Sequence, residues 1–115
     1  MNQLELCLGS VQEMTEGSIY AVVDRYAQAA RIAYIHFRHV RGKVPGHLET
    51  ILDEGDIDMP GVIRIRHAHG YGAHGYGGML IFDHTPEMTC GALWHAGMAY
   101  ALGYMRALLQ TAERS

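Results

Sequence analysis

The chain lacks the features that mark several special classes of protein. Its 2 cysteines, Cys7 and Cys90, could pair with each other but are too few for a disulfide scaffold. Lysine and arginine total 9 against 12 acidic residues, and the formal net charge of −3 gives no electrostatic footprint for nucleic acid or an anionic membrane. No stretch approaches the roughly 18 apolar residues of a membrane span. We therefore expect neither a nucleic-acid partner nor a membrane partner.

A secretory signal is also missing from the first residues. The segment MNQLELCLGS has no basic region and no long apolar run. Together with the scarcity of cysteine, this predicts a reducing, cytoplasmic setting. What is present is ordinary for a globular protein, since 49% of the residues are hydrophobic and 18% are charged. A length of 115 residues suffices for one domain with a core, so we expect residues 1–115 to form one unit.

Short apolar runs alternate with helical patterns along the chain. The runs at 4–8, 32–37 and 79–82 predict three strands. Strands that alternate with helices predict a parallel sheet with right-handed crossovers. Three parallel strands cannot close a barrel, and an eightfold α/β barrel needs about 250 residues. The pattern therefore indicates an incomplete α/β barrel, which is either part of a longer enzyme or a unit that completes itself by association.

The helical patterns lie between and after these runs. We expect Thr15 to cap the first helix, and Asp56 or Asp58 to cap the second. Residues 38–58 form a long polar stretch, which is typical of an active-site loop. The last helix should bury one apolar face, formed by Trp94, Met98, Ala101, Leu102, Met105, Leu108 and Leu109. The Gly-rich segment 67–78 should carry surface loop histidines without a metal role, namely His67, His69 and His74.

One candidate metal ligand stands at or near the end of each predicted strand: Cys7, His36 and Asp83. In parallel α/β folds, ligands bind at the carboxyl ends of the strands. A thiolate, an imidazole and a carboxylate could converge there on one divalent cation, and three protein ligands with open positions are typical of a catalytic metal site. Each residue also has an ordinary structural interpretation that involves no metal. The cysteine could be a small buried hydrophobe, the histidine a hydrogen-bonded partner and the aspartate a turn cap.

Arg38 is a candidate for substrate binding. It follows His36 by two residues and should point to the same side of the strand. Its planar guanidinium suits a substrate carboxylate or hydroxyl, whereas the alternative is an ordinary surface ion pair. The pattern alone leaves both interpretations open.

Several runs of the sequence resemble the C-terminal part of the mannonate dehydratase family. These runs are Cys7–Ser10, Tyr34–Arg38, Asp53–Met59, Asp83–Pro86 and Trp94–Tyr104. The resemblance spans nearly all of this chain and about the last third of the family's enzyme. It implies a partial (β/α)8 TIM barrel in which residues 1–115 are a C-terminal fragment with the last three strand–helix units.

The resemblance also implies a chemistry. The family's enzymes dehydrate D-mannonate to 2-keto-3-deoxy-D-gluconate in hexuronate (glucuronate) catabolism, so the implied activity is that of a hydro-lyase acting on a sugar acid. They use a divalent metal, typically Mn²⁺, with Mg²⁺, Fe²⁺ or Zn²⁺ as alternatives, held by Cys, two His and Asp. Cys7, His36 and Asp83 match three of these ligands, and the second His belongs to a strand that this chain does not contain. His84 matches a catalytic acid/base position. With these parts missing, we expect the chain alone to be inactive.

Two departures from the family pattern and two other hypotheses remain. Phe82 stands where the family has Pro. The segment 67–78 is longer and more repetitive than its counterpart in the family, which could shift the register of the third strand and so change the direction of the Asp83 side chain. One alternative is a non-catalytic remnant that pairs its open sheet edges with another chain or a second copy, forming a homo-oligomer. The other is a related sugar isomerase with a similar divalent-metal site.

Overall fold

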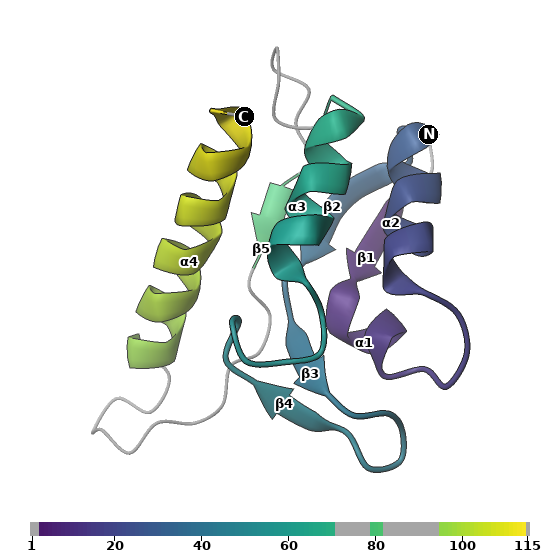
Figure 1. Ribbon diagram of the computed structural model, residues 1–115, viewed down its shortest axis with the longest axis vertical. Helices are drawn as coiled ribbons and strands as arrows, with labels where there is room; N and C mark the ends of the chain where they lie inside the picture. The colour runs from purple at the N-terminus through teal and green to yellow at the C-terminus, as the bar shows by residue number, and fades with distance from the viewer. Residues whose placement is uncertain (1–2, 71–78, 82–94, 115) are drawn as a thin grey trace.

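The computed structural model describes residues 3–70, 79–81 and 95–114, and a parallel sheet lies at its centre (Figure 1). Strands β1 (Leu4–Cys7) and β5 (Met79–Ile81) both pair with β2 (Ile32–His36), which gives the order β1-β2-β5. The α/β class and the three-stranded parallel sheet are thereby confirmed. β1 and β2 each end one residue earlier than predicted.

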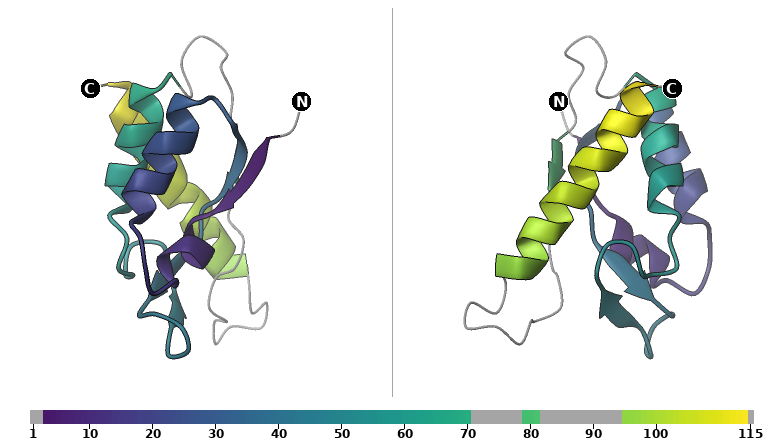
Figure 2. Two further views of the ribbon diagram at one scale, coloured as in Figure 1. Left: turned by 90° about the vertical axis from the view of Figure 1, so that its right-hand side faces the viewer. Right: turned by 60° about the vertical axis from the view of Figure 1, so that its left-hand side comes forward.

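The two faces of the sheet differ in character because side chains alternate along a strand. Leu6 and Ile35, which are register partners, are buried in the hydrophobic core. Their neighbours Cys7 and His36 are also register partners and project from the opposite face. Figure 2 shows the helices on one side of β1 and β2. One face of the sheet is therefore apolar and covered by helices, and the other presents polar side chains.

The covering layer consists of α2 (Ile19–Gln28), α3 (Met59–Ala68) and α4 (His95–Glu113). Each helix contributes a stripe of apolar side chains to one core cluster with the strands. The cluster includes Leu6, Val23, Ala27, Ile35, Val62, Ile63, Ala101 and Met105. Burial of this continuous surface is the main force that holds helices and sheet together.

The predicted apolar face of α4 is only partly correct. Ala101 and Met105 are buried, but Met98 and Leu102 are 36% and 53% exposed. The inward stripe of the helix runs through Ala101, Met105 and Ala112, so positions 98 and 102 lie to one side of it. Trp94 lies outside the described residues.

The helix starts correct one prediction and confirm another. Ser18, not Thr15, caps α2, because the Ser18 Oγ accepts from the backbone N–H of Ala21 at 3.5 Å. Asp58 caps α3, and its Oδ1 accepts from the N–H of Gly61 at 2.9 Å. The cap of α2 was misplaced because two hydroxyl residues precede the helix, and the sequence alone does not show which one ends the loop.

Three elements were not predicted, namely one short helix and the two strands of a hairpin. The short helix α1 (Leu8–Gln12) follows β1 directly, and the stretch expected to be a polar loop contains a hairpin. The hairpin consists of β3 (His39–Arg41) and β4 (Leu48–Thr50), which pair antiparallel to form a separate two-stranded sheet. It lies beyond the carboxyl end of β2, next to α1 (Figure 1). Part of the polar stretch is therefore a folded hairpin, which lies at the carboxyl end of the sheet near Cys7 and His36.

A buried histidine fixes the connection between the hairpin and α3. His39 is 1% exposed, and its Nδ1 lies 2.6 Å from the carbonyl oxygen of Leu52. Its Nε2 accepts from the N–H of Ile57 at 2.7 Å, so the pattern fits the neutral ring protonated at Nδ1. Burial lowers the pKa of His39 below its ordinary value. A Cβ on Gly55 would lie 2.2 Å from this ring, so glycine is required there.

The beginning of the Gly-rich segment differs from the expected loop. His67 belongs to α3, and His69 follows its last residue, where the His69 Nε2 lies 2.7 Å from Asp24 Oδ1. His74 lies outside the described residues. No helix in the described ranges is long and apolar enough to cross a membrane.

Candidate functional site

Two of the predicted ligands lie side by side. Cys7 ends β1, His36 ends β2, and their Cα atoms are register partners in the parallel pairing. Residues that are paired in this way project from the same face of a sheet, which here is the face opposite Leu6 and Ile35. Cys7 is a half-buried free cysteine. The strand pattern therefore placed a thiol and an imidazole correctly at one end of the sheet.

A carboxylate that was not predicted joins this pair. The Glu5 Oε1 lies 3.1 Å from His36 Nε2, and the Tyr34 hydroxyl donates to Glu5 Oε2 at 2.6 Å. The Tyr34 and His36 rings are 5.6 Å apart between centroids. The hydrogen bond to Glu5 raises the pKa of Tyr34, because it favours the protonated phenol. Glu5 stands two residues before Cys7, and this spacing along a strand is the signal that could have revealed it.

Arg38 lies at the junction of the sheet, α1 and the hairpin. Its Nε donates to Glu49 Oε1 at 2.7 Å, and its Nη1 lies 3.3 Å from Glu13 Oε2. The side chain is only 15% exposed. Burial opposes the charged form, but the hydrogen bond and charge of Glu49, the charge of Glu13 and a hydrogen bond with Cys7 raise the Arg38 pKa overall.

The Arg38 ion pairs agree with one of the two interpretations of this residue, although the pairs are partly buried rather than on the surface. Glu13 also pairs with His47, whose Nε2 lies 3.1 Å from Glu13 Oε2. Nothing in the sequence could have revealed Glu13 and Glu49 as partners, because their positions depend on the unpredicted helix and hairpin. A role of Arg38 in binding substrate stays a prediction.

The other two predicted site residues, Asp83 and His84, lie outside the described residues. Within residues 3–70, 79–81 and 95–114, no group of three or more His, Cys, Asp or Glu side chains could hold a metal ion. The described part of the candidate site thus supplies two donors, Cys7 and His36. Thiolate and imidazole are donors that suit divalent transition metals, so the donor types fit such an ion.

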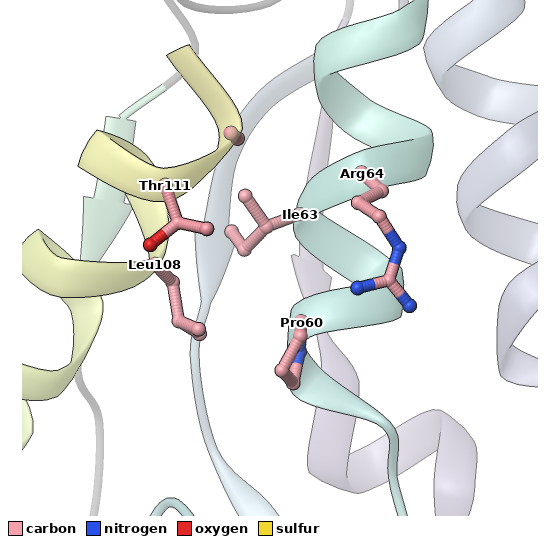
Figure 3. Close-up of a pocket in the computed structure, with 6 residues that line it drawn as sticks. Pro60, Ile63, Arg64, Leu108 and Thr111 are labelled. Carbon is pink, nitrogen blue, oxygen red and sulfur yellow. The ribbon is translucent and has the colours of Figure 1, made fainter. Parts of the chain in front are cut away.

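A pocket elsewhere on the molecule is unconnected with these side chains. Its volume is about 130 Å³, and its lining among the described residues comes from α3 and α4: Pro60, Ile63, Arg64, Leu108, Thr111 and Ala112. Figure 3 shows Ile63 of α3 and Leu108 and Thr111 of α4 pointing toward one another. None of the described strand residues lines it, so it lies in the helical layer rather than beside Cys7 and His36.

Comparison with known proteins supports the family resemblance that the sequence motifs indicate. The family described as D-mannonate dehydratase (UxuA) matches residues 1–114. The chain belongs to the D-mannonate dehydratase family. Its predicted resemblance to that family is therefore confirmed. No curated protein matches the chain.

A solved structure supports the fold of this D-mannonate dehydratase family member. It is the crystal structure of mannonate dehydratase from Streptococcus suis serotype 2, which matches with a TM-score of 0.80 and 23% sequence identity. The match covers 97% of this chain and 33% of that chain. The chain thus spans about a third of the length of that protein, and it shares the fold of that part.

Proposed function

We propose that this chain forms three strand–helix units of a (β/α)8 barrel that dehydrates D-mannonate to 2-keto-3-deoxy-D-gluconate in hexuronate catabolism. The observation that carries the proposal is the pairing of Cys7 with His36 on the sheet face opposite Leu6 and Ile35, at the carboxyl ends of β1 and β2. In barrels of this kind, that end carries the active site. Membership of the D-mannonate dehydratase family over residues 1–114 supports this choice of reaction.

Cys7, His36 and Asp83 would hold the divalent metal of this site. Mn²⁺ is the ion proposed, with Mg²⁺, Fe²⁺ and Zn²⁺ as alternatives; Zn²⁺ binds such donors more tightly on the usual affinity order, so metal availability decides. When bound, the metal would stabilise the negative charge that develops on the substrate as C2 loses its proton.

The protein's own side chains would bind the substrate and move its protons. His84, next to the ligand Asp83, would act at the C2 proton or the leaving C3 hydroxyl, because an imidazole titrates near neutral pH. Arg38 would contact a carboxylate or hydroxyl of the substrate. Glu49 and Glu13 accept from its Nε and Nη1, which fixes the plane of the guanidinium beside Cys7.

The first experiment replaces the matching third of the Streptococcus suis enzyme with residues 1–115 of this chain. The chimera should convert D-mannonate in the presence of Mn²⁺, and Cys7→Ala or His36→Ala should abolish the conversion. Thr15→Ala, at an exposed position that caps nothing, is the matched control and should keep full activity. A folded chimera that binds Mn²⁺ but forms no product would contradict the proposed reaction.

The isolated chain gives a second test. A barrel of this type has eight strands, and the chain would supply three of them with one metal ligand missing. We therefore expect no product when the chain alone is mixed with Mn²⁺ and D-mannonate. Product formation above the level of a Cys7→Ala variant would contradict the proposed dependence on further strands.

The sheet edges favour one alternative function, that of a self-associating module. Among the described residues, the sheet ends at β1 and β5, and each of these strands pairs only with β2. Unpaired strand edges are templates for pairing with another chain. Light scattering coupled to size-exclusion chromatography separates the cases, because a stable homo-oligomer supports this module and a folded monomer contradicts it.

A further inference from the structure

We infer that Glu5 is a positioning residue that holds the His36 ring for metal binding, and that Tyr34 in turn holds Glu5. The inference rests on the proposed metal site and extends it to two residues outside the ligand set. It starts from the geometry of one carboxylate with two partners. The Glu5 Oε1 lies 3.1 Å from His36 Nε2, and Oε2 accepts from the Tyr34 hydroxyl at 2.6 Å.

The backbone fixes this arrangement. Glu5 is the register partner of Tyr34, and Cys7 is the register partner of His36. The four residues are thus adjacent alternate positions on two paired strands, and all project from the face opposite the core. The carboxylate meets the imidazole diagonally across the strands, within the reach of long side chains.

The chemistry of metal-binding histidines gives the carboxylate its role. Such a histidine usually donates its second ring N–H to a carboxylate or carbonyl, which fixes the tautomer and the direction of the ring. A carboxylate that is itself held by a hydrogen bond has fewer accessible rotamers. Tyr34 provides that bond, and the resulting order Tyr34–Glu5–His36 would restrain the ring before the metal arrives.

An alternative role for Glu5 is a cross-strand contact that only stabilises the sheet. The two roles differ in what they change. A stabilising contact alters the free energy of unfolding without the metal, whereas a positioning contact alters the affinity and the coordination spectrum of the metal.

The test uses Co²⁺ as the probe, because its visible bands report coordination geometry and its charge-transfer band reports a bound thiolate. The whole chain, Glu5→Gln, Tyr34→Phe and the double variant are titrated with Co²⁺. Glu16→Gln is the matched control, since Glu16 is an exposed glutamate in the loop before α2. Thermal unfolding of each metal-free variant is measured in parallel.

We expect Glu5→Gln to weaken Co²⁺ binding by about 10–100-fold and to shift the visible bands. Tyr34→Phe should weaken binding in the same direction but less. The double variant should be no weaker than Glu5→Gln alone, because Tyr34 acts through Glu5. The control should match the unchanged chain.

Each contrary result is decisive. If the unchanged chain shows no thiolate band with Co²⁺, the proposed metal site fails and the inference fails with it. If the unchanged chain binds but both single variants bind within twofold with the same spectrum, the metal site stands and the positioning role is overturned. If Glu5→Gln does not fold, Tyr34→Phe, which removes only one oxygen, decides by the same criteria.

Discussion

The side chain of Arg38 lies directly against Gly9 at the start of α1. A Cβ on Gly9 would be 2.8 Å from Arg38 Cγ and 2.9 Å from Cδ, closer than van der Waals contact allows. The absence of a side chain at position 9 therefore lets Arg38 lie flat and reach Glu13 and Glu49.

Gly9→Ala should accordingly displace Arg38 and weaken both ion pairs. We expect the free energy of unfolding to fall by about 1–3 kcal/mol, as for other overpacked sites. Gly103→Ala is the matched control, because position 103 is exposed within α4 and a Cβ there would meet none of the described residues within 4 Å beyond its own helical backbone. That change should stabilise the chain by about 0.5–1 kcal/mol, since alanine favours a helix more than glycine does. Urea denaturation measures both, and equal effects of the two substitutions would contradict the packing argument.

Gly55→Ala should be more damaging. Its Cβ would lie 2.2 Å from the His39 ring and 2.5 Å from the Val40 carbonyl oxygen, and backbone cannot move aside cheaply. A loss of about 3 kcal/mol is expected, at the upper end for overpacking. Gly46→Ala, in the same hairpin region, meets only the Lys43 carbonyl oxygen at 3.9 Å and should be nearly neutral. A stable Gly55→Ala protein would show that His39 is less tightly enclosed than described.

The buried His39 predicts a pH dependence of stability. Its pKa is lowered in the folded chain, so below about pH 6.5 the unfolded chain binds a proton at this residue that the folded chain does not. The contribution of His39 should be constant above this pH and should be lost progressively as the pH falls toward the folded pKa. Urea denaturation from pH 8 to pH 5 measures it. His39→Gln should remove this part of the slope. Identical slopes for the unchanged chain and His39→Gln would refute the assignment.

The corrected cap of α2 can be tested by two substitutions. Ser18→Ala removes the acceptor for the Ala21 N–H and should cost about 0.5–1 kcal/mol. Thr15→Ala should change the free energy of unfolding by less than about 0.5 kcal/mol, as is usual at exposed positions. The reverse order of effects in thermal or urea unfolding would restore Thr15 as the cap.

The sequence predicted the parts of the fold whose cause is local. Apolar runs identified β1, β2 and β5, and the start of α3 was narrowed to Asp56 or Asp58 as its cap. The five-residue helix α1 is too short for a periodic signal, and Leu8 continues the apolar run of β1, so the strand was extended by one residue. The hairpin strands have three residues each, and their pairing depends on long-range contacts of Arg38 and His39 that no local pattern contains.

The candidate site, like the fold, could be predicted from the sequence only in part. Cys7 and His36 were predicted to lie together because each stands near the end of a parallel strand, where the carboxyl ends of neighbouring strands meet. Strand alternation counted back from these two residues would have added Glu5 and Tyr34, but a glutamate in a short strand carries no distinctive motif. The partners of Arg38 come from α1 and the hairpin, and only a three-dimensional structure brings them together.

The register between β1 and β2 decides whether Cys7 and His36 lie side by side, so an error in strand alignment would change the candidate site. A shift of β1 by one residue would exchange its two faces, so Leu6 would leave the core and Glu5 would enter it. A shift by two residues would keep the faces but place Cys7 beside Tyr34 instead of His36. Every misaligned form therefore separates the thiol from the imidazole. If Cys7 and His36 bind a metal as proposed, binding would select the correctly aligned chain, and the metal spectrum would then report the alignment of β1 with β2.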